Sequence, residues 1–204
     1  MQVKKESIKN RILQAARREF KNKNYEKASI RTIAQNAGVT PSNIYNYFEN
    51  KDELFRTILQ PLINKIEVGK KALNKFEFDR EPEAHEDLDS HHEIIIDSAR
   101  IVEENREDLK LLVFKSKGSS LENFLDSLTN WFAEEFKKSL PEKAQYEIDG
   151  FLVHVMSSIW FNSIREILMH DIKGERMMNI AEDLMTFIFT GWRNLMEEKN
   201  IDCH

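Results

Sequence analysis

The feature that most constrains the fold is the stretch Ile30–Tyr47, IRTIAQNAGVTPSNIYNY, where a small residue, a glycine and an aliphatic residue follow one another at set intervals. Ala34 is small enough to let a second helix cross the first at a steep angle, and Gly38 can adopt the positive φ of a sharp bend. Three apolar residues stand at offsets that would hold the two helices together: Ile33, Val39 and Ile44. This spacing predicts a helix-turn-helix, although a plain helical hairpin also fits Ala-x-x-x-Gly.

Local signals predict further helices around this stretch. Residues 7–21 place four apolar residues on one helical face: Ile8, Ile12, Ala16 and Phe20. Ser29 is suited to cap the helix that follows it, and Thr40 is suited to cap the next, with a proline directly after it. A fourth helix is expected over residues 52–76, kinked at Pro61.

The rest of the chain also indicates helices. Six glycines and four prolines in 204 residues are about half the usual share, which disfavours turn-rich β folds. Residues 77–93 contain eight acidic side chains and are expected to form a solvated connection, disordered in part. Apolar periodicity then predicts helices over 94–102, 109–114, 121–136, 142–169 and 175–196. The sequence therefore predicts an all-α fold of about nine helices.

Charge is distributed unevenly along the chain. Residues 1–51 hold 11 Lys or Arg against four Glu, a balance of +7, whereas the remaining residues hold 19 basic and 31 acidic side chains, a balance of −12. A basic head on an acidic body is typical of a small DNA-binding unit on a platform that does not bind DNA. Uneven scatter of surface charge would give the same numbers.

Several classes of protein are disfavoured. A single cysteine, Cys203, excludes a disulfide framework and a cysteine-based zinc site. Glu-x-x-His pairs, His-Glu-x-x-His and phosphate-binding glycine clusters are absent, so we expect neither an enzyme nor a cofactor. His85, His91 and His92 lie in the acidic connection without firm metal-ligand spacing. No apolar run is long enough to span a membrane and no signal sequence precedes the first helix, so a cytoplasmic location is expected.

The stretch from Thr40 to Phe55, TPSNIYNYFENKDELF, resembles the recognition helix and the following helix entry of the TetR family of transcriptional regulators. The matching positions are Tyr45, Tyr47, Phe48, Lys51, Leu54 and Phe55. Upstream, Ile12-Leu13-x-Ala15-Ala16-x-x-x-Phe20 and Tyr25-x-x-Ala28-Ser29-Ile30 fit the same family pattern. The resemblance covers about residues 7–60.

The resemblance implies a DNA-binding domain over residues 1–52 and a helical effector-binding and dimerisation domain over residues 53–204. Short polar side chains of the recognition helix are candidates for reading base edges in the major groove: Ser42, Asn43 and Asn46. Family members use four other positions on phosphates, which implies that role for Thr40, Tyr45, Tyr47 and Lys51. Arg31 in the preceding helix is a further candidate.

One helix-turn-helix covers too little duplex for specific affinity, so a homodimer on a palindromic operator is expected. The last two helices carry broad apolar bands and are the expected interface, although both could be core alone. An apolar or aromatic small-molecule effector of unknown identity is expected against six residues whose alternative role is core packing: Trp131, Phe132, His154, Met156, Trp160 and Phe161.

Together these inferences predict a ligand-responsive repressor that binds double-stranded operator DNA. Two other classes stay open at this point. A helical protein–protein adaptor would bind its partner without DNA readout, and a metal-dependent helical enzyme would need a ligand set that the sequence does not display.

Overall fold

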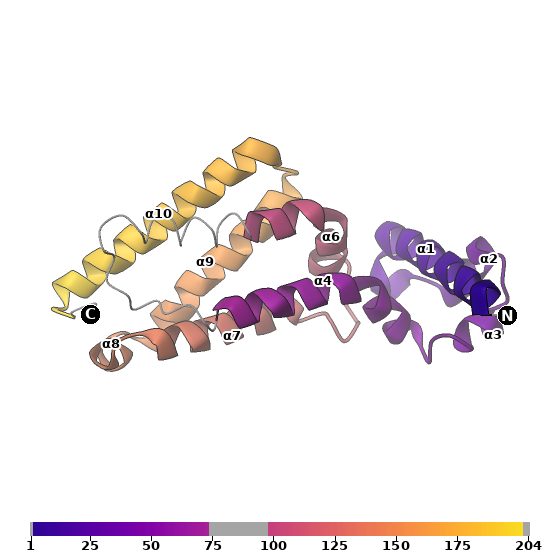
Figure 1. Cartoon of the computed structure of the whole chain (residues 1–204), viewed down its shortest axis with the longest axis horizontal. Coiled ribbons are helices and arrows are strands. Elements are labelled where there is room, and N and C mark those ends of the chain that lie inside the picture. The colour runs from indigo at the N-terminus through magenta and orange to yellow at the C-terminus, as the bar shows by residue number, and fades with distance from the viewer. Residues whose placement is uncertain (1, 74–97, 202–204) are drawn as a thin grey trace. The chain divides into compact units, whose positions relative to one another are not determined.

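The structure is a computed structural model that describes residues 2–73 and 98–201, with side chains over residues 5–71 and 98–201 (Figure 1). Every regular element within those ranges is a helix, which confirms the predicted all-α class. The chain divides into two compact units. The first comprises residues 1–67 and 107–124, and the second comprises residues 68–106 and 125–204. The functional boundary at residues 52–53 remains a prediction.

The first unit is built on the helix-turn-helix. It contains α1 (Gln2–Lys27), α2 (Ile30–Ala37), α3 (Pro41–Tyr45), most of α4 (Lys51–Leu73) and nearly all of α6 (Arg106–Phe114). α1 packs on α2, and α2 packs on α3. The short α3 is therefore held by its neighbours, since five residues make too few internal hydrogen bonds to be stable alone.

The turn between α2 and α3 has the predicted chemistry. Gly38 ends α2 with φ 66°, and the Val39 N–H donates to the Ala34 carbonyl at 3.0 Å. The Ser29 hydroxyl caps α2 by accepting from the Thr32 N–H, and the Thr40 hydroxyl caps α3 by accepting from the Asn43 N–H. The predicted caps and the glycine bend are confirmed.

Aromatic rings fill the core of the first unit. Phe20 lies edge-to-face against Phe55, with ring centroids 4.9 Å apart, and Tyr25 contacts both rings. Six aliphatic side chains in this unit are fully or almost fully buried: Ile12, Ile33, Ile44, Leu54, Leu59 and Leu62. This core joins α1, α2, α3 and α4 into one body.

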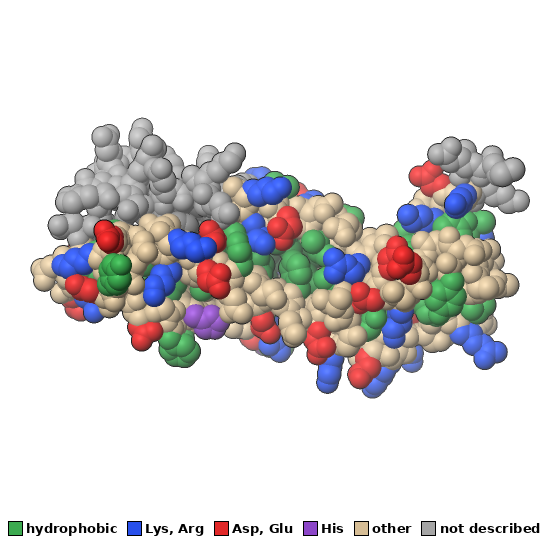
Figure 2. All heavy atoms as spheres, turned by 90° about the horizontal axis from the view of Figure 1, so that it is seen from below, with side chains coloured by type: hydrophobic (Ala, Val, Ile, Leu, Met, Phe, Trp, Pro, Cys, Tyr) green, Lys and Arg blue, Asp and Glu red, His purple; other side chains and the backbone are tan. Residues whose placement is uncertain are grey.

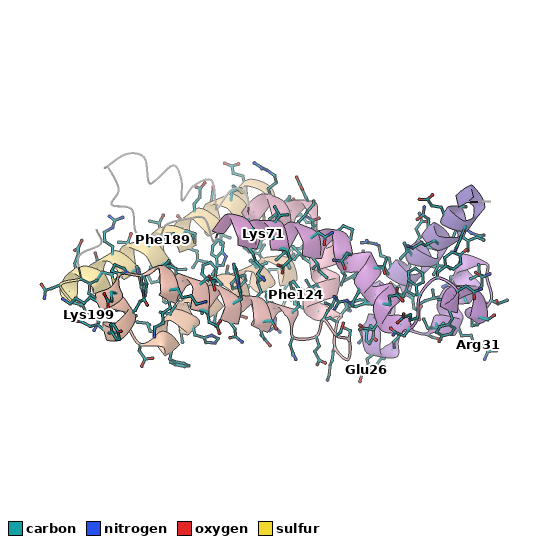
Figure 3. All side chains as sticks on the ribbon, turned by 60° about the horizontal axis from the view of Figure 1, so that its bottom comes forward. Glu26, Arg31, Lys71, Phe124, Phe189 and Lys199 are labelled. Atoms are coloured by element: carbon teal, nitrogen blue, oxygen red, sulfur yellow. The ribbon has the colours of Figure 1, made fainter. Side chains whose placement is uncertain are left out.

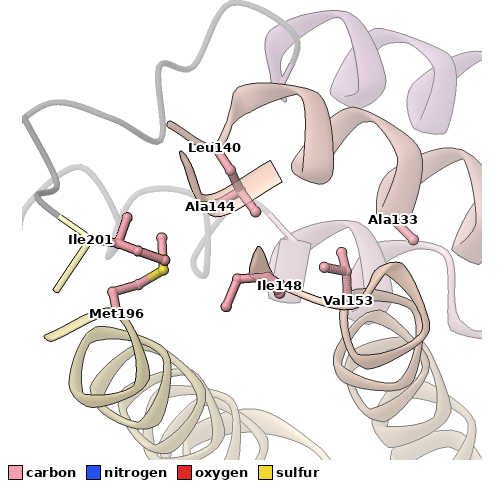
Figure 4. Close-up of a cluster of buried hydrophobic side chains, with 7 residues drawn as sticks. All are labelled: Ala133, Leu140, Ala144, Ile148, Val153, Met196 and Ile201. Carbon is pink, nitrogen blue, oxygen red and sulfur yellow. The ribbon is translucent and has the colours of Figure 1, made fainter. Parts of the chain in front are cut away.

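The second unit contains the remaining helices. Residues 98–104 are helical and are followed by α7 (Phe124–Ser139), α8 (Glu142–Glu147), α9 (Gly150–Met169) and α10 (Gly174–Glu198). One cluster of buried apolar side chains draws on α7, α8, α9 and α10 (Figure 4): Ala133, Leu140, Ala144, Ile148, Val153, Met196 and Ile201. Phe136, Trp192 and Leu195 pack against it.

Four predicted elements differ from the structure, one of them α6, which begins at Arg106 rather than at residue 109. α1 begins at Gln2 rather than at residue 7, and it is interrupted where Asn24 adopts φ 63°. The single helix predicted over 142–169 is wrong, because Ile148 is extended and Asp149 starts a new helix by accepting from the Phe151 N–H at 2.8 Å. α7 begins at residue 124, three residues later than expected.

Two expectations concern residues 61 and 77–93. α4 continues as a helix through Pro61 to Leu73. The acidic connection, with His85, His91 and His92, lies outside the described residues.

Replacing Gly38 with alanine tests the role of the bend. At φ 66° an L side chain is strained by about 1–2 kcal/mol, so the variant should be destabilised by that amount in urea unfolding. Gly69, inside α4 with no atom within 4 Å of an added Cβ, is the matched control. Gly69→Ala should stabilise by about 0.5–1 kcal/mol. Equal effects at the two positions would contradict the assignment of Gly38 to the left-handed cap.

Candidate nucleic-acid interface

α3 has one buried face and one exposed polar face. Ile44 and Phe48 are 1% and 2% exposed, and they fix the helix and the turn after it to the core. Four predicted contact residues lie exposed: Thr40, Ser42, Tyr45 and Asn46. Tyr45 is 54% exposed although its ring is apolar, so its surface is free for a partner. The structure therefore brings these four side chains together on the accessible side of α3.

Two other predicted residues of α3 and its end are half-buried. Asn43 has its side-chain oxygen enclosed without a hydrogen-bond partner among the described residues. Tyr47 lies under the Lys5 ammonium, which is 6.0 Å from the centre of its ring. Asn43 is thus less accessible to a base edge than Ser42 or Asn46, and its reading role remains a prediction.

The Thr40 hydroxyl already has two contacts within the protein. Its oxygen accepts from the Asn43 N–H at 3.3 Å and lies 2.9 Å from the Ser42 hydroxyl oxygen. Capping accounts for Thr40, and a phosphate contact would be additional to it. Arg31, in the first turn of α2, is exposed (Figure 3).

Lys51 occupies a place that its sequence pattern did not indicate. Its ammonium donates to the backbone carbonyls of Tyr25, Glu26 and Ala28 at 2.9, 3.4 and 3.3 Å. It also lies 4.5 Å from the centre of the Tyr25 ring. The side chain therefore satisfies carbonyls where α1 ends, and its predicted phosphate contact would require the ammonium to leave them.

The packing of α6 and the following loop on the first unit was not foreseen from the sequence. Arg17 pairs with Asp108 and Lys21 pairs with Glu107, so two bases of α1 meet the first turn of α6. The only sequence signal for this contact is the spacing of the charges: the two basic residues are four apart on α1, and the two acidic residues are adjacent on α6.

The loop after α6 is attached by hydrogen bonds. The Ser120 N–H and hydroxyl donate to Asp52 at 2.8 and 2.6 Å, and the Tyr25 N–H donates to the Lys115 carbonyl at 2.8 Å. Burial, followed by the charge of Asp52 and a hydrogen bond to it, raises the pKa of the Tyr25 phenol. The phenol therefore stays neutral and able to donate a hydrogen bond to Asp52.

The residues predicted to contact an effector lie in the second unit, and the structure brings some of them together. Phe132 and Phe161 are edge-to-face at 5.7 Å, and the Lys70 ammonium lies 4.6 Å from the centre of the Trp131 ring. Met156 and Trp160 are half-buried on α9.

His154, the predicted polar anchor, has different neighbours. It is stacked 6.4 Å from Phe151 and lies 3.5 Å from the Ser158 hydroxyl, both on its own helix. These contacts assign no ligand role to any of the six residues, which remain a prediction.

The geometry of the first unit defines a class of protein. Residues 12–58, from the middle of α1 into α4, match the sequence model described as bacterial regulatory proteins, tetR family. Residues 12–58 therefore match the helix-turn-helix domain of the tetR family, as the sequence resemblance implied. No curated protein sequence matches the chain significantly.

Solved structures extend the likeness to nearly the whole chain. NalD of Pseudomonas aeruginosa, the secondary repressor of the MexAB-OprM multidrug efflux pump, is 18% identical with a TM-score of 0.65, over 92% of this chain and 97% of NalD. FadR of Bacillus subtilis, solved with stearoyl-CoA, is 16% identical with a TM-score of 0.58, over 87% and 96%. PfmR of Thermus thermophilus, a TetR family regulator, is 22% identical with a TM-score of 0.57, over 87% and 96%. At these identities the shared property is the fold.

None of the helices in residues 2–73 and 98–201 is long and apolar enough to cross a membrane. The same ranges hold no group of three or more His, Cys, Asp or Glu side chains arranged to ligate a metal.

Lys51→Met tests the assignment of Lys51 to the carbonyls that end α1. The variant leaves three carbonyls without their charged donor, so the first unit should lose about 1–3 kcal/mol of stability in chemical unfolding. Lys23→Met, on the exposed surface of α1, removes the same charge and should change stability little. A stable Lys51→Met protein would show that the carbonyl contacts are dispensable and would favour the predicted phosphate role.

Proposed function

We propose that this chain is a DNA-binding transcriptional regulator that acts as a ligand-responsive repressor. The observation that carries the proposal is the division of α3 into a buried face, Ile44 and Phe48, and an exposed polar face. A helix so presented can enter the major groove, where short polar side chains such as Ser42 and Asn46 reach base edges. This proposal also places the chain in the cytoplasm, in the compartment of the DNA.

The homodimer is part of the proposal because α9 and α10 expose large apolar side chains. Phe151 and Phe187 are each 72% exposed, and Leu152 and Ile159 are 37% and 40% exposed. Figure 2 shows hydrophobic side chains at the surface among charged ones on one face of the molecule. A second copy covering this surface would pair two helix-turn-helix units, as a two-fold related operator requires.

The effector is proposed from the second unit and from the structural neighbours. NalD is a repressor of an efflux pump, and FadR was solved with an acyl-coenzyme A. In this chain, apolar and aromatic residues of α7 and α9 are only half-buried, which suits an apolar ligand better than a polar one: Trp131, Phe132, Met156 and Trp160. Relief of repression would then follow from tighter ligand binding to the conformation that does not bind DNA.

Two single variants of α3 separate base reading from phosphate binding. Asn46→Ala should weaken binding to the operator by about 1–3 kcal/mol and should hardly change binding to a random duplex. Tyr45→Phe removes an exposed hydroxyl and should weaken binding to both duplexes by the same factor. Fluorescence anisotropy with the region upstream of the chain's own gene, at two salt concentrations, measures both effects.

The same titrations test the function itself. Wild-type affinity should fall steeply with salt. Binding of a partner that ignores salt, with no binding to any duplex, would favour the adaptor over the regulator. Equal losses on the two duplexes for Asn46→Ala would remove Asn46 from the base-reading set.

Acidic substitutions on the exposed face of α9 and α10 test the dimer. Phe151→Glu combined with Phe187→Glu should yield a monomer in sedimentation velocity, because each buried Phe contributes about 1.5–3 kcal/mol and buried carboxylates oppose association. Val68→Glu, at an exposed valine of α4, is the control and should stay dimeric. A wild-type monomer, or a dimeric double variant, would contradict the proposed interface.

A further inference from the structure

Some basic side chains of α1 form ion pairs with acidic residues of α6, and others do not. Toward its carboxyl end, Arg17 and Lys21 form ion pairs with Asp108 and Glu107 of α6. Toward its amino end, Lys5 and Lys9 form no ion pair with any described residue. Lys5 and Lys9 are thus two positive charges of α1 that no acid among the described residues neutralises.

These two lysines lie beside the end of α3. The Lys5 ammonium is 6.0 Å from the centre of the Tyr47 ring, and the Lys9 ammonium is 5.8 Å from the centre of the Phe48 ring. The two lysines are four residues apart, so they share one face of α1. Figure 1 shows the amino-terminal end of α1 close to α2 and α3 within this unit. We call Lys5 and Lys9 the α1 lysine pair.

The ring contacts orient the ammonium groups without occupying their donors. A cation over an aromatic ring is held by the ring's electron density, and its remaining N–H bonds stay available for an anion. Tyr47 and Phe48 follow α3 directly, so the α1 lysine pair is positioned by the same segment that carries the exposed polar face. Any duplex that receives α3 in its major groove brings phosphates along both sides of that groove.

From this arrangement we propose that the α1 lysine pair is a second DNA-contacting element, in which Lys5 and Lys9 bind backbone phosphates beside the groove that α3 enters. The inference rests on the proposed DNA-binding function. Lysine is a flexible point charge suited to a phosphate, and it carries no fixed geometry for reading a base edge. The pair would add affinity without sequence preference and would fix the angle at which α3 meets the duplex.

Counterion release makes the proposal measurable. Each phosphate contact makes the negative slope of log affinity against log salt steeper by about 0.9. At about 0.1 M salt this corresponds to roughly eightfold in affinity per contact. Lys5→Gln and Lys9→Gln should each make the slope shallower by about 0.9, and the double variant by about 1.8. The probe is a fluorescein-labelled random-sequence duplex of about 30 base pairs, long enough for two half-sites a helical turn apart.

Three variants control the measurement. Lys23→Gln removes the same charge from the exposed surface further along α1 and should leave the slope unchanged. Lys5→Arg and Lys9→Arg keep the charge and should keep the wild-type slope. Thermal unfolding of every variant checks that the first unit is folded, and only folded variants enter the comparison. The arginine variants report on the same positions if a glutamine variant does not fold.

The possible outcomes are distinct. Wild-type slopes in Lys5→Gln and Lys9→Gln, with the wild-type protein bound to DNA, would overturn the role of the α1 lysine pair and leave the proposed function standing. An equal loss of slope in Lys23→Gln would show a general charge effect and would also overturn it. A wild-type protein that binds no duplex at any salt concentration would overturn the proposed function and the inference together.

Discussion

Burial of Ile44 and Phe48 is the interaction on which the rest of this structure depends. α3 is too short to be stable by its own hydrogen bonds, so its position is set by these two side chains and by the Thr40 cap. With these two side chains buried and α3 packed on α2, the polar residues of α3 have only the solvent side available. The orientation that a DNA reader needs is thus a consequence of core packing.

Several basic side chains of the first unit bind groups within that unit. Lys51 binds the carbonyls that end α1, and Arg17 and Lys21 are neutralised by the acids of α6. The carboxyl half of the first unit's longest helix is thereby used for internal cohesion. Chain connectivity adds one further relation: Glu107 belongs to the first unit, whereas its neighbour Arg106 is buried in the second unit and donates to the Ile172 carbonyl. The boundary between the two units therefore falls at the peptide bond between Arg106 and Glu107.

The parts of the fold that could be predicted are those determined by local chemistry. Ala34, Gly38 and the Ser29 and Thr40 caps act within a few residues of their own position, so their spacing was sufficient. Ile148 fits the periodicity of a long apolar helix face, and only the capping side chain of Asp149 shows that a new helix begins there. Lys51 and the acids of α6 could not be placed, because their partners lie 23 or more residues away in the chain and no local pattern specifies them. The roles of the proposed effector residues are still harder to predict, because half-buried aromatic residues serve core packing and ligand binding equally well.

The central claim, that the polar face of α3 lies in the major groove in two copies, is tested most directly by cleavage of DNA from a reagent on that face. Asn46→Cys in a Cys203→Ser background provides one thiol on α3 for an iron–EDTA label that cuts nearby deoxyribose. The account predicts two discrete clusters of cuts on the operator, related by two-fold symmetry and separated by about one or more helical turns. Diffuse cutting equal to that of free label, or a single cluster without its symmetric counterpart, would contradict it.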